Sequence, residues 1–187
     1  YCSSGSTTID RYVIYNYLEK IWYYGTLART AWLDSGLRDK PLAATYDLNL
    51  VDHEEGIDDN AGSSAAAITA YVESSDFDIG DGDRFSLVNR VVPDASFDGS
   101  TADSPVATMT LHALSGSGSG RNSPASEGGS SNATITRSAT SPVEVFTDSI
   151  NIRVRGRQLS MRFESSATGV TWQLGTPRLD IRPDGRR

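Results

Sequence analysis

The sequence has very few of the residues on which redox and metal chemistry depend. It contains one cysteine, Cys2, and two histidines, His53 and His112, among 187 residues. A lone cysteine excludes an internal disulfide and a thiolate metal site. The two histidines are far apart in the sequence and match no ligand or catalytic-triad spacing. We therefore expect no redox centre, no metal site and no cofactor.

Membrane-spanning and helical patterns are also missing. No apolar run approaches the roughly 18 residues of a membrane helix, so we expect no membrane anchor. No stretch keeps apolar residues at positions i, i+3, i+4 and i+7 for three turns, which argues against a helical fold. The chain begins at Tyr1 with neither the charged nor the apolar segment of a signal peptide, and we expect it to be part of a longer protein.

The first third of the chain has short segments that favour β-strands. The segment RYVIYNYLEKIWYYG is rich in aromatic and β-branched residues around a polar break, which predicts a hairpin of strands at about 11–17 and 20–25. A short strand is expected within 28–36 and a pair of short strands within 46–56. Short strands at this close spacing are typical of one sheet of a β-propeller or a sandwich.

From Ala65 onward the pattern predicts longer strands, interrupted by one segment of low complexity. Met109, Leu111 and Ala113 alternate with polar residues, as in a half-buried strand. Segment 115–132 has 12 Gly or Ser in 18 residues, and we expect it to be a flexible loop. Strands are also predicted in the ranges 65–74, 84–92, 106–114, 149–165, 169–175 and, with an extended end at Pro183, 177–185.

Charge is unevenly distributed in this acidic chain, whose formal net charge is −7. Positions 1–150 hold 9 Lys or Arg against 21 Asp or Glu, whereas positions 151–187 hold 8 Arg against 3 Asp or Glu. This asymmetry is typical of a basic region that meets an anionic partner, either nucleic acid or an acidic protein surface. Protection of solvated strand edges by positive charge explains it equally well.

Arginines alternate with apolar residues in INIRVRGRQLSMRFES, within 149–165. The alternation changes parity at Gly156, which predicts either a bulge at this glycine or a tight hairpin centred on Gly156 and Arg157. In both cases four guanidinium groups should stand on one side of a sheet. The candidate basic site comprises these four and the arginines near the end of the sequence: Arg153, Arg155, Arg157, Arg162, Arg178, Arg182, Arg186 and Arg187.

Catalytic and ligand-binding motifs are weak. The acidic pairs Glu54–Glu55 and Asp58–Asp59 are typical of solvated turns rather than of an acid and base pair. Four aspartates in 76–83 suggest calcium, but the spacing departs from the EF-hand pattern at Asp81 and Leu87. Asn132-Ala-Thr134 matches a glycosylation acceptor by chance. We expect no enzyme.

Several segments, taken in order, resemble the C-terminal part of tail nozzle or tail hub proteins of short-tailed bacteriophages, also called packaged-DNA stabilisation proteins. The segments are YVIYNYLEKIWYYGTLARTAW, HEEGIDDN, YVESSDFDIGDGDRFSLVNRVVPDASF, RVRGRQLSMRFES and GVTWQLGTPRLDIRPDGRR. The resemblance implies the terminal part of a β-propeller over 1–62 and a β-sandwich-like antiparallel domain over 63–187. It also implies a six-fold homo-oligomeric ring in the virion tail, below the portal and the head-to-tail adaptor.

Two functions follow as hypotheses. In a nozzle, the ring would contact the adaptor, a tail fibre or spike and a tail plug or needle, while double-stranded DNA passes along the axis. The basic residues would then join subunits or face the channel, and the acidic remainder would repel DNA so that it slides. The alternative is a receptor- or glycan-binding tail module that uses Trp22, Trp32 and Trp172 as sugar platforms, although strand packing explains these aromatics better.

Overall fold

The computed structural model describes residues 1–116, 122–124, 134–136 and 138–185 of the chain. These residues form antiparallel strands with no helix among them, so the all-β prediction is confirmed. The strands belong to two compact units. One consists of Tyr1–Gly56 and Asn60–Ser64, and the other of Ile57–Asp59 and Ala65–Arg187.

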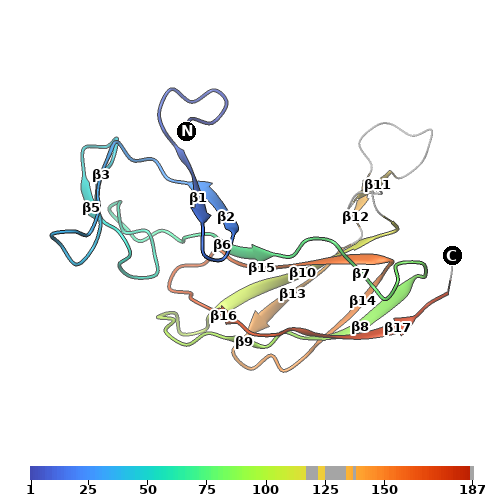
Figure 1. The fold of residues 1–187 in the computed structure, drawn as a ribbon. Coiled ribbons are helices and arrows are strands. Elements are labelled where there is room, and N and C mark those ends of the chain that lie inside the picture. Colours follow the sequence, from blue (N-terminus) through green and yellow to red (C-terminus); the bar gives the residue numbers. More distant parts are fainter. Residues whose placement is uncertain (117–121, 125–133, 137, 186–187) are drawn as a thin grey trace. The chain divides into compact units, whose positions relative to one another are not determined.

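The first unit contains two small sheets (Figure 1). One is the hairpin of β1 (Arg11–Asn16) and β2 (Ile21–Thr26), built from the β-branched and aromatic residues that favour strands. Asn16 shapes its turn, because its Oδ1 accepts a hydrogen bond from the backbone N–H of Leu18 at 3.1 Å. The hairpin predicted over 11–25 is confirmed.

The other sheet of this unit joins β3 (Ala31–Leu33), β4 (Leu42–Ala44) and β5 (Leu50–Asp52). The prediction of two strands within 46–56 is wrong: β5 alone lies there, and its neighbour β4 comes before a turn at Leu48, which has a φ of 63°. The short strands expected in one sheet thus occupy two sheets. That they belong to a propeller stays a prediction.

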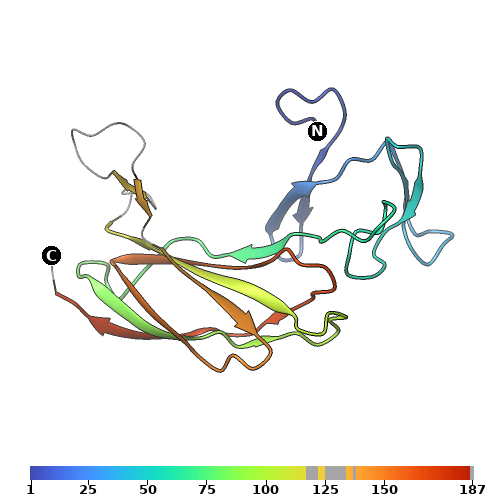
Figure 2. The same cartoon turned by 180° about the vertical axis from the view of Figure 1, so that it is seen from behind.

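The second unit is a sandwich of two sheets that face each other (Figure 1, Figure 2). The larger sheet consists of β6 (Ala70–Glu73), β7 (Phe77–Asp78), β10 (Val106–Leu114), β13 (Ser138–Glu144) and β15 (Gln158–Ser165). Its order is β13-β10-β15-β6, and β7 also pairs with β15. The smaller sheet has the order β14-β8-β17, with bounds Ile150–Gly156, Ser86–Val92 and Arg178–Pro183.

Two short strand pairs complete this unit. β9 (Ala95–Ser96) pairs with β16 (Gln173–Leu174), and β11 (Asn122–Pro124) pairs with β12 (Thr134–Thr136). The flexible loop predicted over 115–132 lies outside the described residues, except for residues 115–116 and β11. Pro183 ends the edge strand β17, as its missing N–H requires.

The core of the sandwich lies between its two sheets. The predicted inward set of β10 is confirmed, because the alternating residues Met109, Leu111 and Ala113 are 2%, 1% and 0% exposed. The smaller sheet contributes the buried Val88 and Val91. Burial of each valine, leucine or methionine in this core stabilises the fold by about 1.5–3 kcal/mol.

Gly156 lies at a corner where the chain passes from one sheet to the other. β14 pairs with β8 and β15 pairs with β10, so neither the hairpin nor the bulge expected at Gly156 occurs. The bulge of β14 lies instead between Asn151 and Val154. The change of parity at Gly156 therefore follows from the change of sheet, since the two sheets bury opposite sides of the chain.

Candidate functional site

The outer side of the smaller sheet is rich in arginine. Residues directly opposite each other on neighbouring strands point to the same side of a sheet. Leu87 of β8 lies opposite Arg155 of β14 and opposite Arg182 of β17, while the next residue, Val88, points into the core. Arg155, Leu87 and Arg182 thus form one row across the outer side.

A second row, formed by Asn151, Arg90 and Asp180, extends this surface, as do Arg178 and Arg153. Arg90 of β8 lies between Asn151 and Asp180, and Arg178 lies opposite Val92. Arg153 lies in the bulge of β14 and is exposed, whereas the neighbouring Ile152 packs against the core. We call this surface the basic face, defined by Arg90, Arg153, Arg155, Arg178 and Arg182, with Leu87, Val92, Asp180 and Asp184 among them.

One end of the basic face is held in place by stacking and hydrogen bonds. The guanidinium of Arg155 lies 4.1 Å from the centre of the Phe85 ring, and that of Arg157 lies 4.8 Å from it. Arg155 also forms an ion pair with the carboxylate of Asp184 and donates to its backbone oxygen at 3.1 Å. The backbone of Phe85 bonds to that of Asp184 and Gly185 at 2.8 and 2.9 Å, which fixes the main chain that carries the ring.

An open groove of about 440 Å³ adjoins this end. Arg153 and Arg155 stand along it, and its described lining residues are Phe85, Ala113, Ser115, Ser138, Arg153, Val154 and Arg155. Guanidinium groups and serine hydroxyls are donors that suit an anionic group. The groove therefore extends the positive character of the basic face around the edge of β14.

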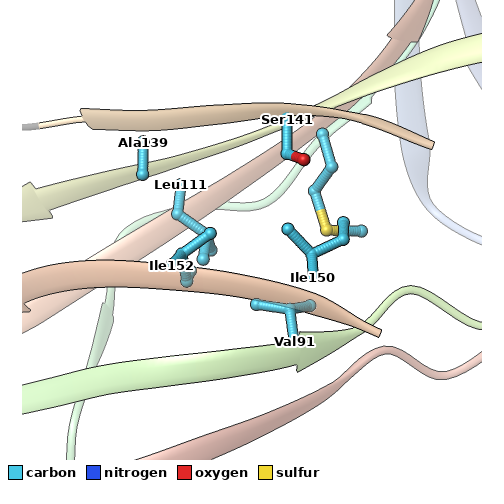
Figure 3. A pocket seen from close by; sticks show the side chains of 7 residues that line it. Val91, Leu111, Ala139, Ser141, Ile150 and Ile152 are labelled. Atoms are coloured by element: carbon cyan, nitrogen blue, oxygen red, sulfur yellow. The ribbon is translucent and has the colours of Figure 1, made fainter. Parts of the chain in front are cut away.

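A second space, inside the sandwich, is not a binding site. Figure 3 shows Leu111, Ala139 and Ser141 of the larger sheet facing Val91, Ile150 and Ile152 of the smaller one. The space between them has no room for a water molecule and has an apolar lining. It is a small packing gap between the two sheets.

The structure separates the arginines that the sequence placed on one side of one sheet, so that prediction is wrong. Arg153 and Arg155 belong to the basic face, and Arg157 lies at the corner between the sheets. Arg162 lies on β15 in the larger sheet. Among the residues predicted near the end of the chain, Arg178 and Arg182 belong to the basic face, whereas Arg186 and Arg187 lie outside the described residues.

Arg162 is engaged within its own sheet. Its guanidinium pairs with Glu164 at 2.7 Å and with Glu73 at 2.9 Å, and it lies 4.0 Å from the centre of the Tyr71 ring. The hydrogen bond with Glu164 is the main reason that the pKa of Arg162 is raised above its ordinary value, with a further contribution from Glu73. This side chain therefore serves the fold.

Arg90 was not predicted as a member of the site. The segment LVNRVV around Arg90 has the composition of a buried strand, and its adjacent valines obscure the alternation of apolar and polar residues. In the structure, β17 has no residue opposite Asn89, so the strand changes parity there and both Val88 and Val91 point inward. A charged residue inside a strand of valines was the signal that such a bulge is present.

The remaining candidate residues lie apart from one another. In the part of the chain that the structure describes, no three His, Cys, Asp or Glu side chains are grouped so that they could hold a metal ion. His53 accepts a hydrogen bond from Arg29 Nε at 3.0 Å and stacks with Trp32 in the first unit, while His112 lies on β10 of the other unit. Cys2 is exposed and unpaired with any cysteine.

The three tryptophans differ in their surroundings. Trp172 packs edge-on against Phe163 in the sandwich and donates from Nε1 to Ser165 at 3.0 Å. Trp32 is half exposed beside His53. Trp22, which is 66% exposed, stacks on Tyr15. Of the predicted sugar platforms, Trp172 is thus largely committed to packing, and Trp22 is the most accessible.

Among the described residues, no helix is both long enough and apolar enough to cross a membrane. No family model matches the chain, and the comparison with curated proteins gives no match. Its function is therefore argued from the surfaces described above.

Proposed function

We propose that this chain is a structural component of the tail of a short-tailed bacteriophage. In this proposal it forms part of a ring-shaped nozzle, or hub, that extends the DNA channel below the portal and adaptor. The ring retains the packaged genome and conducts it during ejection. The chain is not an enzyme, and its partners are further copies of itself, the adaptor, a fibre or spike, and a plug or needle.

The observation that supports this proposal most is the basic face in an otherwise acidic chain. Positions 1–150 hold an excess of 12 acidic charges, which oppose the binding of a passing polyanion to this part of the chain. A conduit benefits from this repulsion, because each phosphate contact would add a grip that must be broken before DNA moves. The ordered resemblance of five segments to nozzle proteins supports the same assignment.

The test is to locate the chain in assembled particles. Particles whose copy of this chain has a small tag should be imaged by electron microscopy at low resolution. We expect the tag to repeat six-fold around the tail axis, below the portal. A particle without the tag, or with it at the tip of a peripheral fibre, would refute the nozzle assignment.

A receptor- or glycan-binding module remains the second candidate because the hairpin of β1 and β2 exposes aromatic rings. Trp22 and Tyr24 are 66% and 68% exposed on the same side of this hairpin. Binding of the isolated chain to host-envelope glycans, lost in Trp22→Ala, would favour this candidate. A nozzle component should bind none of them.

A further inference from the structure

We propose that the basic face binds the aspartate loop of a second copy of this chain. The aspartate loop is the segment 76–83, which contains Asp76, Asp78, Asp81 and Asp83, all exposed. The inference rests on the proposed function in one respect, that a tail ring is built from repeated copies. It names the partner of the basic face, which the proposed function leaves open.

The backbone of the aspartate loop is anchored in the sandwich. Ile79 is 8% exposed, belongs to the core and donates its N–H to the backbone oxygen of Arg157 at 2.9 Å. The preceding β7 pairs with β15, and Asp78 accepts a hydrogen bond from Gln158 Nε2 at 2.7 Å. Gly80 and Gly82 have φ values of 66° and 69°, which turn the chain sharply. The loop thus presents its carboxylates from a fixed base.

The charges of the two surfaces are complementary. The basic face has five arginines and two aspartates, and the aspartate loop has four aspartates, of which Asp83 pairs with the neighbouring Arg84 at 3.5 Å. Arg153, Arg178 and Arg182 have no ion-pair partner among the described residues. Guanidinium groups bind carboxylates in a planar, two-bonded geometry, which gives such a contact a defined orientation.

The composition of the basic face favours a protein partner over nucleic acid. Asp180 and Asp184 stand among the arginines, where they would repel phosphate groups. Leu87 and Val92 lie on the same side and offer the apolar contact that is common in protein interfaces rich in arginine. The net charge of −7 would also oppose the approach of DNA.

The other acidic run of the sequence, 52–59, is largely used within the chain. Asp58 accepts from the backbone N–H of Gly169 with both oxygens, at 2.8 and 2.9 Å. Asp52 and Glu55 form ion pairs with Arg38 and Lys40. The aspartate loop and the basic face belong to the same compact unit, so the geometry between them is the same in every copy. A contact between two different surfaces repeats from copy to copy and closes a ring when its rotation allows.

The test uses the full chain and reversal of charge. One variant reverses the basic face (Arg153→Glu with Arg182→Glu), and the other reverses the aspartate loop (Asp81→Arg with Asp83→Arg). Self-association is measured by sedimentation velocity at low and high salt. We expect the unaltered chain to associate at low salt, and each variant to associate on the order of 100-fold more weakly because like charges then face each other.

Two combinations make the test specific. Mixing the two variants should restore association, because the intact face of one meets the intact loop of the other and the two reversed surfaces also attract each other. Combining all four substitutions in one chain should restore association, because the charges are exchanged. The control, Arg38→Glu with Lys40→Glu, changes the net charge in the same direction and by the same amount as the face variant, and it should associate like the unaltered chain. Circular dichroism checks that every variant is folded.

Three outcomes would overturn the inference. The first is that the unaltered chain stays monomeric at low salt. The second is that the variant with all four substitutions is folded but does not regain association. The third is that the unaltered chain binds duplex DNA and the face variant does not, while the face variant self-associates as the unaltered chain does. The proposed tail function fails separately, by absence of the chain from particle tails. Association by the stated surfaces in a chain absent from tails would uphold this contact and refute that function.

Discussion

At the scale of single residues, the arginines of the second unit differ in what they contact. The side chain of Arg162 is 26% exposed and lies between two carboxylates and a tyrosine ring, so its charge is balanced within the fold. Arg178 is exposed on the edge strand β17 with no such partners among the described residues. Identical side chains thus contribute to stability in one case and to surface charge in the other.

Replacement of Arg162 by alanine should lower the free energy of unfolding by about 1–2 kcal/mol, because Glu73 and Glu164 lose a charged hydrogen-bond partner. Urea unfolding measures the change. Arg178→Ala is the matched control and should alter stability by less than about 0.5 kcal/mol. Equal stability of the two variants would contradict the structural role given to Arg162.

At the scale of secondary-structure elements, the corner between β14 and β15 determines which arginines share a surface. Gly156 is closely surrounded there: a Cβ atom would lie 2.9 Å from the Cβ of Ala113 and from the backbone oxygen of Gln158. The backbone oxygen of Leu114, at 3.0 Å, also accepts the N–H of Arg157. Backbone atoms held in hydrogen bonds cannot move away cheaply, so this position requires glycine.

Gly156→Ala should therefore destabilise the sandwich by about 1–3 kcal/mol, the usual effect of an overpacked site. Gly116→Ala is a suitable control, since no described atom beyond its chain neighbours lies within 4 Å of the Cβ that it would add. Thermal unfolding of the two variants gives the comparison. If Gly156→Ala has the same melting temperature as the unaltered chain, the corner is less tightly packed than the structure indicates.

At the scale of the whole molecule, the two units differ greatly in their cores. In the first unit, which the structure describes completely, the buried positions are Pro41, Ala43 and Thr45. Both sides of its hairpin expose large apolar side chains, among them Tyr12, Ile14, Tyr15 and Trp22. A two-stranded hairpin is marginally stable alone. We therefore expect the first unit to be marginally stable in the isolated chain and to gain much of its stability when another surface covers its exposed apolar side chains.

Limited proteolysis of the isolated chain should cut the first unit first and leave a resistant fragment that begins near Ala65. The reason is the difference in buried apolar area, since the second unit buries residues such as Phe163 and Leu159 completely. Mass spectrometry of the fragments locates the cuts. In assembled particles the same bonds should be protected. A monomer whose first unit resists protease as well as the sandwich does would contradict this expectation.

Much of the second unit could be predicted from the sequence. Alternation in 106–114 located a strand and its buried side, and the valines of 84–92 located another. The excess of arginine after position 150 indicated a basic surface. These features depend on local chemistry: β-branched and aromatic residues favour the extended chain, and side chains alternate along it.

The membership of the basic face was decided by the tertiary structure. Arg90 belongs to the basic face because β8 lies between β14 and β17 and changes parity at Asn89. Arg162 does not belong to it, because the chain passes to the larger sheet at Gly156. Both facts depend on hydrogen bonds between strands far apart in the sequence. The sequence by itself determined that the chain forms strands and that its charges are uneven. Long-range pairing determined which charges share a surface, because a strand's neighbours are chosen by the whole sheet.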